Sequence, residues 1–185
     1  MPSRDPLDLH PELRKRWEWM QREWGERYPD APAPFLTTTH RPASEQQALV
    51  NAGRSRAQPG QSLHNPKPAL AFDVAFRQSD GSITWEFPWF QAWGELAEGI
   101  GLEWGGRWEG LVDGPHVQWP VSWQVAQRRG SLPPLPPLPN KFENPMLNVA
   151  TLHITGRDGL VRIIPLDPDA PARVVGLKLF ANEAR

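Results

Sequence analysis

The chain has 185 residues, with 20 Lys and Arg against 21 Asp and Glu, for a formal net charge of −1. This length fits one domain of ordinary size with some residues left for an appendage. The balanced charge gives no support to a nucleic-acid partner, and no run approaches the roughly 18 apolar residues of a membrane span, so we expect neither. Cysteine is absent, which excludes disulfides and thiolate metal sites. Any metal must therefore be held by His and carboxylate groups.

The first residues lack the apolar core of a signal peptide. We therefore expect synthesis in the cytoplasm, so that any action outside the cell requires another route of export. Ten Trp and 22 Pro are many for this length. Tryptophan covers protein cores and sugar-like ligands alike, and the sequence leaves both roles open.

The N-terminal third predicts two helices joined by a short strand. Residues 9–28 have the apolar spacing of an amphipathic helix, residues 35–39 are β-prone, and residues 42–53 predict a second helix. The first helix has an apolar stripe at positions i, i+4, i+7 and i+11, which is typical of a packing helix. This stripe consists of Leu13, Trp17, Met20 and Trp24.

The middle of the chain predicts a β-hairpin. Residues 69–77 alternate as a strand does, so that Asp73 shares one face with small alanines while the other face is bulky and apolar. The bulky face is expected to be buried, which places Asp73 on a face that looks into a cleft. A turn at 79–81 and a return strand at 83–87 complete the hairpin.

A third helix and a further strand follow. The helix is expected to begin near Pro88 and to end at Gly99 or Gly101, with its buried face formed by apolar side chains between them. Gly105-Gly106 permits a close backbone approach. Residues 116–119 predict one more strand at the floor of a site.

The composition changes past residue 122. Residues 130–139 repeat Pro and Leu, which predicts a polyproline II spacer; a stiff linker is favoured over a ligand for a Pro-binding module. Strands are expected at 147–155, 160–166 and 174–180, with a hairpin turn at 156–159. So small a β-rich piece buries little by itself, so we expect it to dock on a partner or on the main domain. We therefore divide the chain into a domain at 1–125, a Pro-rich linker at 126–145 and a β-rich appendage at 146–185.

Two segments carry side chains suited to a metal site. His64 is followed nine residues later by Asp73, and Asp113 is followed three residues later by His116. Each alone is commoner as an ordinary polar residue or a turn, but together each supplies the partner that the others need. A catalytic zinc takes three protein ligands and keeps its fourth position for water. We therefore predict that His64, Asp73 and His116 hold a metal and that Asp113 carries protons.

An ordered set of motifs within residues 35–119 resembles a known family. It resembles the zinc D-Ala-D-Ala carboxypeptidase and L-alanyl-D-glutamate endopeptidase family, above all its phage endolysin branch. The resemblance implies an α+β, hedgehog-type peptidase domain, to which we add the small β-rich C-terminal appendage. The motifs are Thr37-x-x-x-Arg41, Glu45-Gln46, Gly60-x-Ser62-x-His64, Ala71-x-Asp73, Trp104-Gly105-Gly106 and Asp113-x-Pro115-His116.

The resemblance also implies a role for each site residue. It implies Zn²⁺ as the cofactor, with Asp113 as general base and acid. It implies that Arg41 faces the scissile carbonyl or a substrate carboxylate. One departure is the stretch between the first His and the Asp, which is longer than in the family and lacks its glycine, so we expect a different loop shape and substrate choice. The implied zinc ligands are His64, Asp73 and His116, and the implied supporting residues are Ser62 and Gln46.

The implied function is a zinc peptidase that cuts peptidoglycan stem peptides, foremost between L-Ala and D-Glu, in endolysin-like wall lysis. Such an enzyme acts at the bacterial cell wall after delivery by lysis or another export route. Two alternatives remain open: a carboxypeptidase that trims a terminal D-Ala, and a non-catalytic wall-binding or virion module of the same fold. The C-terminal appendage is expected to bind the cell wall or a phage or other protein partner.

Overall fold

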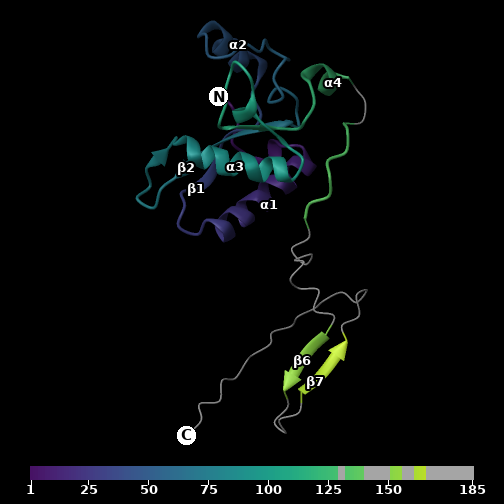
Figure 1. Cartoon of the computed structure of the whole chain (residues 1–185). Coiled ribbons are helices and arrows are strands. Elements are labelled where there is room, and N and C mark those ends of the chain that lie inside the picture. Colours follow the sequence, from purple (N-terminus) through teal and green to yellow (C-terminus); the bar gives the residue numbers. More distant parts are fainter. Residues whose placement is uncertain (129–131, 140–150, 156–160, 166–185) are drawn as a thin grey trace. The chain divides into compact units, whose positions relative to one another are not determined.

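The computed structural model describes residues 1–128, 132–139, 151–155 and 161–165 (Figure 1). It divides into two compact units, Met1–Leu138 and Pro139–Arg185. The predicted boundaries at 125 and 145 stay a prediction.

The first unit is built on a five-stranded antiparallel sheet. Its central strand is β2 (Ala71–Arg77), which pairs with three others: β1, β3 and β5. The main path runs β1-β2-β5-β4, with β3 attached to β2. The other strands are β1 (Ala33–Thr38), β3 (Ile83–Thr84), β4 (Glu103–Trp104) and β5 (His116–Gln118).

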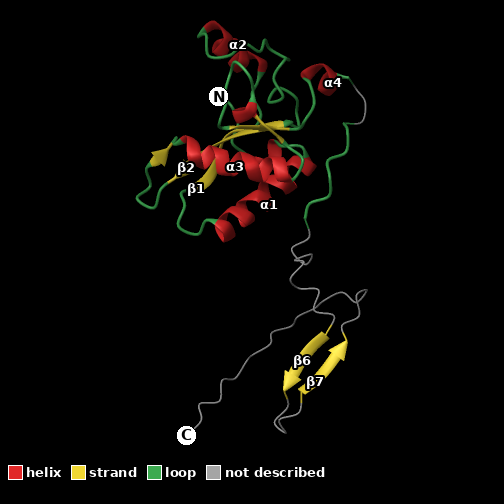
Figure 2. Ribbon diagram, in the orientation of Figure 1, coloured by secondary structure: helices red, strands yellow, loops and turns green. Residues whose placement is uncertain are grey.

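Helices cover both faces of this sheet. Helices α1 (Pro11–Arg27) and α3 (Phe87–Gly99) lie on one face, and α2 (Ala43–Asn51) lies on the other (Figure 2). A short helix, α4 (Trp123–Gln127), follows β5. The predicted α+β class is therefore confirmed. Among the described residues, none of the helices combines the length and the apolar character that crossing a bilayer requires.

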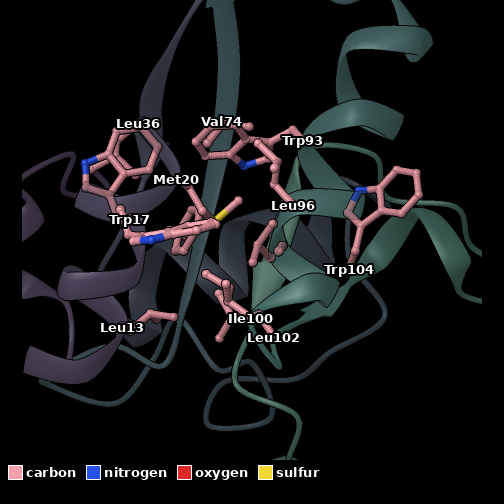
Figure 3. Packing of buried hydrophobic residues seen from close by; sticks show 14 of the residues in the cluster. Leu13, Trp17, Met20, Leu36, Val74, Trp93, Leu96, Ile100, Leu102 and Trp104 are labelled. Carbon is pink, nitrogen blue, oxygen red and sulfur yellow. The ribbon is translucent and has the colours of Figure 1, made fainter. Parts of the chain in front are cut away.

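The first helix forms where its sequence pattern predicts. Pro11 occupies its first turn, where the missing N–H costs nothing, and His10 caps it by accepting the Glu12 N–H at 3.3 Å. The predicted apolar stripe is buried and packs against α3 and β2 in an aromatic-rich core (Figure 3). Trp17, for example, packs edge-on against Phe72 and Trp93.

The hairpin after β2 is shorter than predicted. Strand β3 ends at Thr84, so the return strand expected at 83–87 is wrong beyond that residue, because α3 begins at Phe87. The alanine face of β2 is also more enclosed than expected: Ala71 and Ala75 are both fully buried. Asp73 is the half-buried exception on that face.

The Pro-rich stretch packs on the first unit. Residues 132–138, called the strap below, place a half-buried leucine at every third position between exposed prolines. This spacing matches the three-residue repeat of polyproline II. Two side chains of the unit bind strap carbonyls: Arg16 Nη2 donates to Pro136 O at 2.5 Å, and Trp119 Nε1 donates to Pro133 O at 3.1 Å.

The second unit contains an antiparallel pair of strands. Strands β6 (Thr151–Thr155) and β7 (Val161–Pro165) pair with Thr151 opposite Pro165. They confirm the strands expected at 147–155 and 160–166 over residues 151–155 and 161–165. The remaining residues of both expected strands lie outside the described residues. The turn expected at 156–159 and the strand expected at 174–180 lie outside the described residues.

Candidate metal centre and active-site cavity

The predicted metal ligands converge on one face of the sheet. Asp73 in β2 is the direct cross-strand partner of His116 in β5, and His64 comes from the loop that precedes β2. Asp73 Oδ1 lies 3.0 Å from His64 Nε2 and 2.9 Å from His116 Nδ1, and the two imidazole nitrogens are 3.2 Å apart. The longer loop between His64 and Asp73 therefore still lets these side chains meet.

The second nitrogen of each imidazole is engaged elsewhere. His64 Nδ1 lies 2.7 Å from the Thr39 carbonyl, which only accepts, so Nδ1 carries the hydrogen and Nε2 keeps its lone pair. His116 Nε2 lies 3.0 Å from Gln118 Oε1, which leaves the lone pair on Nδ1. Each neutral ring thus turns an acceptor nitrogen toward Asp73.

Three acceptor atoms facing one point suit a cation. The ligand atoms of His64, Asp73 and His116 all lie within 4.8 Å of one another. Tetrahedral zinc, with ligands at about 2.0–2.2 Å, separates its ligand atoms by about 3.3–3.6 Å, close to the spacings found here. The three residues therefore fit a divalent metal. Within the described part of the chain, they form the group of His and Asp side chains that could hold a metal ion.

The same charges set the pKa values of the centre when no metal neutralises it. Burial lowers the pKa of His64, which Asp73 offsets only in part. Burial also opposes the charged form of His116, but the hydrogen bond and charge of Asp73, with the charge of Asp113, outweigh it and raise that pKa. For Asp73 the two imidazoles outweigh burial and hold its pKa well below the ordinary range. The electrostatics of the centre therefore favour a positive charge beside Asp73.

Asp113 lies beside this centre. A Cβ placed on Gly105 would lie 3.1 Å from the Cβ atoms of both Asp113 and His116, and 2.7 Å from the Asp113 carbonyl. Glycine at 105 is thus what lets the loop carrying Asp113 approach the centre. Burial, together with the charge of Asp73, raises the pKa of the Asp113 carboxyl, although His116, His64 and Arg41 oppose the shift.

Arg41, Gln46 and Ser62 form the supporting side of the site. Arg41 donates from Nη2 to Asp73 Oδ2 and from Nη1 to Gln46 Oε1, each at 3.2 Å. Gln46 is fully buried and donates to Ser55 Oγ at 2.8 Å. Ser62 Oγ accepts the backbone N–H of His64 at 3.3 Å. Arg41 therefore binds the second oxygen of Asp73, while Ser62 positions the backbone of His64.

A cavity of about 750 Å³ opens over the metal centre. Its lining includes the three predicted ligands and Asp113, together with arginines at 41, 54 and 56. Aromatic and apolar side chains also line the cavity, among them Trp108, Leu111 and Trp123. The site therefore offers a metal position and the half-buried carboxyl of Asp113 next to space for a peptide.

Sequence reasoning missed several residues of the site. The Thr39 carbonyl, which fixes the His64 ring, carries no residue-type signal, because every residue has a carbonyl. Gln118 and Trp108 also contact His116, through a hydrogen bond and through a ring contact with centroids 5.0 Å apart. Gln118 had a usable signal, because position i+2 on a strand shares the face of His116.

Asp73 and His116 on the sheet and His64 on the loop before it, beside a carboxyl and a cavity, form the arrangement of a metal-dependent hydrolase. Residues 55–119 match the family described as D-alanyl-D-alanine carboxypeptidase. The chain is 30% identical over 130 residues to the peptidoglycan L-alanyl-D-glutamate endopeptidase CwlK of Bacillus subtilis, covering 61% of this chain and 74% of that protein. The crystal structure of the L-Ala D-Glu endopeptidase ChiX of Serratia marcescens is similar, with a TM-score of 0.51, 26% identity, and coverage of 64% of this chain and 88% of that one.

The chain therefore belongs to the D-alanyl-D-alanine carboxypeptidase family of peptidases. Members of this family are zinc-dependent in general. The predicted family resemblance and the implied peptidase fold are thereby confirmed.

Proposed function

We propose that this protein is a zinc-dependent peptidase that hydrolyses peptidoglycan stem peptides at the bond between L-Ala and D-Glu. The observation that carries the proposal is the meeting of His64, Asp73 and His116 through atoms 2.9–3.2 Å apart. Both of the relatives described above are named as endopeptidases for this bond, which favours it over other stem-peptide bonds.

Zinc, held by these three residues, would polarise the scissile carbonyl and acidify the attacking water. Asp113 is the group that moves the proton. It accepts the proton from water as the carbon–oxygen bond forms and delivers it to the leaving amine as the carbon–nitrogen bond breaks. The raised pKa of Asp113 suits both steps, because a carboxyl whose pKa is shifted toward the working pH is both a better proton acceptor and still able to donate.

Arg41 has two tasks in this proposal. Its hydrogen bond to Asp73 Oδ2 orients that ligand so that Oδ1 faces the imidazoles. Its place in the cavity wall allows its remaining N–H groups to bind the developing oxyanion or a substrate carboxylate.

The cavity wall supports an anionic substrate. Arg54 and Arg56 line the cavity together with Arg41, and their side chains are exposed. Guanidinium groups bind carboxylates through paired hydrogen bonds. A stem peptide that contains D-Glu presents such carboxylates next to the scissile bond.

The test is digestion of purified peptidoglycan, with mass analysis of the products. Zinc-loaded protein is expected to release fragments with a new D-Glu amino terminus, and a chelator is expected to stop the release until zinc is restored. Absence of new amines from every wall type, with one zinc bound per chain, would overturn the proposal. Release that a chelator leaves unchanged would overturn the role of the metal.

The second candidate is removal of a terminal D-Ala, which the description of the matching family favours. Product masses separate the two reactions, because a carboxypeptidase releases free D-Ala and leaves the L-Ala bond intact. A non-catalytic wall-binding or virion module of the same fold is distinguished by its metal content, since such a protein need not carry stoichiometric zinc.

We further propose an endolysin-like role in wall lysis, with synthesis in the cytoplasm and delivery through lysis or another export route. The likeness of the motif set to the phage endolysin branch supports this role. Lysis of host cells on co-expression with a membrane-permeabilising protein, and none without it, is the expected result.

A further inference from the structure

Gln118 and Glu103 form a polar pair directly next to the metal centre. Strand β5 carries His116 and Gln118 two residues apart, so both side chains lie on the same face of the sheet. Glu103 in β4 is the cross-strand partner of Gln118, just as Asp73 in β2 is the partner of His116. Two adjacent cross-strand pairs therefore form one polar row.

Hydrogen bonds link the residues of this row from His116 to Glu103. Gln118 Oε1 lies 3.0 Å from His116 Nε2, and Gln118 Nε2 donates to Glu103 Oε2 at 3.1 Å. The other oxygen of Glu103 accepts the indole N–H of Trp108 at 2.5 Å. The side chains of Gln118, Glu103 and Trp108 are half-buried, and the ring of His116 is almost wholly buried.

An ionised carboxylate only accepts hydrogen bonds, so Glu103 forces Gln118 to turn its NH₂ group toward it. The amide oxygen of Gln118 then faces His116. Because this oxygen only accepts hydrogen bonds, His116 must donate one from Nε2. The lone pair of the imidazole is left on Nδ1, the atom that lies 2.9 Å from Asp73 Oδ1.

We propose that Gln118, oriented by Glu103, is a positioning residue that holds His116 in the tautomer able to bind a metal through Nδ1. Glu103 and Trp108 complete this device, since the same carboxylate that orients Gln118 also anchors the indole against the His116 ring. The inference rests on the metal centre of the proposed function and extends it outward by two residues. Partners of this kind typically change metal affinity by about 10–100-fold when they are removed.

The decisive variants exchange the amide and the carboxylate. Gln118→Leu removes the acceptor for His116, and Glu103→Gln lets the amide at 118 turn over and offer its NH₂ group to His116. The double variant Glu103→Gln, Gln118→Glu exchanges the two groups and keeps the net charge. The carboxylate at 118 accepts from His116 and from the amide NH₂ at 103, and the amide oxygen at 103 accepts from the Trp108 indole. The control is Gln91→Leu in α3, which removes an exposed glutamine that makes a similar amide-to-carboxylate bond, 3.1 Å to Glu95.

The first measurement is zinc affinity of the full chain, by competition with a chromophoric chelator. Each single change is expected to weaken zinc binding about 10–100-fold, and the double exchange to restore it to within a few-fold of the natural protein. Wild-type affinity in Gln118→Leu would overturn the inference. So would a double variant as weak as the singles.

The second measurement is the ¹⁵N NMR spectrum of His116 in metal-free protein at alkaline pH, where the imidazole is neutral. The hydrogen is expected on Nε2 in the natural protein and in the double variant, and on Nδ1 in a larger share of Glu103→Gln molecules. A hydrogen on Nδ1 in the natural protein would overturn the inference. Because this readout uses neither metal nor substrate, it separates failure of the inference from failure of the proposed hydrolysis.

Discussion

The metal centre and the Pro-rich strap are both assembled from segments far apart in the chain, yet only the metal centre can be predicted from residue types. His64, Asp73 and His116 have chemistry that needs a partner, so their identities alone indicate that they belong together. The strap is bound through carbonyl groups, by Arg16 at Pro136 and by Trp119 at Pro133. Every residue has a carbonyl, so composition predicts the shape of this segment but not its attachment.

The two regions also differ in what their interactions do. The strap adds apolar contact to the core, because Leu135 packs against both buried clusters of the first unit. The centre turns the lone pairs of two imidazoles and the carboxylate of Asp73 toward one point, where a cation would stabilise them. We therefore expect changes in the strap to lower stability and changes in the centre to lower activity.

The largest effect is expected from Asp113→Asn. Loss of the proton carrier should reduce kcat/KM for wall hydrolysis by about 10²–10⁴-fold, while zinc stays bound, because Asp113 is not among the predicted ligands. Turnover is measured on purified peptidoglycan and zinc by competition. The control is Asp30→Asn, an exposed carboxyl in a turn. Wild-type turnover in Asp113→Asn would remove Asp113 from the mechanism.

Arg16→Met tests the other side of the comparison. The guanidinium of Arg16 is 2% exposed and donates to the carbonyls of Ile100, Glu12 and Pro136. Methionine leaves these carbonyls without their donor, which should lower the unfolding free energy of the full chain by about 2–4 kcal/mol. Denaturant unfolding measures it, with exposed Arg22→Met as the control. Zinc affinity should stay within a few-fold of the natural protein; a large loss would show that the two regions are coupled.

Leu135→Asp is expected to have a smaller effect on stability. Full burial of a leucine contributes about 1.5–3 kcal/mol to the free energy of unfolding, and a half-buried one contributes roughly half of that. The new charge adds a cost of desolvation, so we expect the free energy of unfolding to fall by about 2 kcal/mol. The control Pro137→Asp introduces the same charge at an exposed position of the strap. Equal melting temperatures for the two variants would show that the leucine face of the strap does not contribute to folding.

Much of the fold could be predicted because local patterns decide it. The stripe from Leu13 to Trp24 requires a buried helix, and the bulky residues of β2 require a buried strand. The return strand expected at 83–87 is wrong beyond Thr84, because α3 begins at Phe87. The spacing of apolar residues does not give the residue at which one element ends and the next begins.

The metal ligands could be predicted, but not the residues that orient them. His and Asp are few and their chemistry is specific, whereas Gln118 and Glu103 resemble ordinary surface polar residues. Their roles follow from the register of β4 with β5, which pairs Glu103 with Gln118. The register of two strands depends on the packing of the whole sheet, so it cannot be predicted from the sequence of one segment.

The smallest effect, and one that links stability to activity, is the pH dependence of Asp113→Asn in metal-free protein. Burial raises the pKa of Asp113 above its unfolded value near 3.8, so the native state holds this proton more tightly than the unfolded state does. The natural protein therefore loses stability as pH rises from the unfolded pKa through the folded one, and the neutral Asn side chain does not. The variant should melt above the natural protein at neutral pH, with a gap that closes as pH falls toward 4.

Zinc should also narrow this gap at neutral pH, since a nearby cation stabilises the Asp113 carboxylate. Melting curves with chelator and with zinc, each at several pH values, measure both effects against Asp30→Asn. A gap that is the same at every pH would mean that the Asp113 carboxylate has no burial cost in the native state. Asp113 would then resemble the strap in having a structural role. It would shape its loop, and its carboxylate would not be destabilised in the native state in a way that serves catalysis.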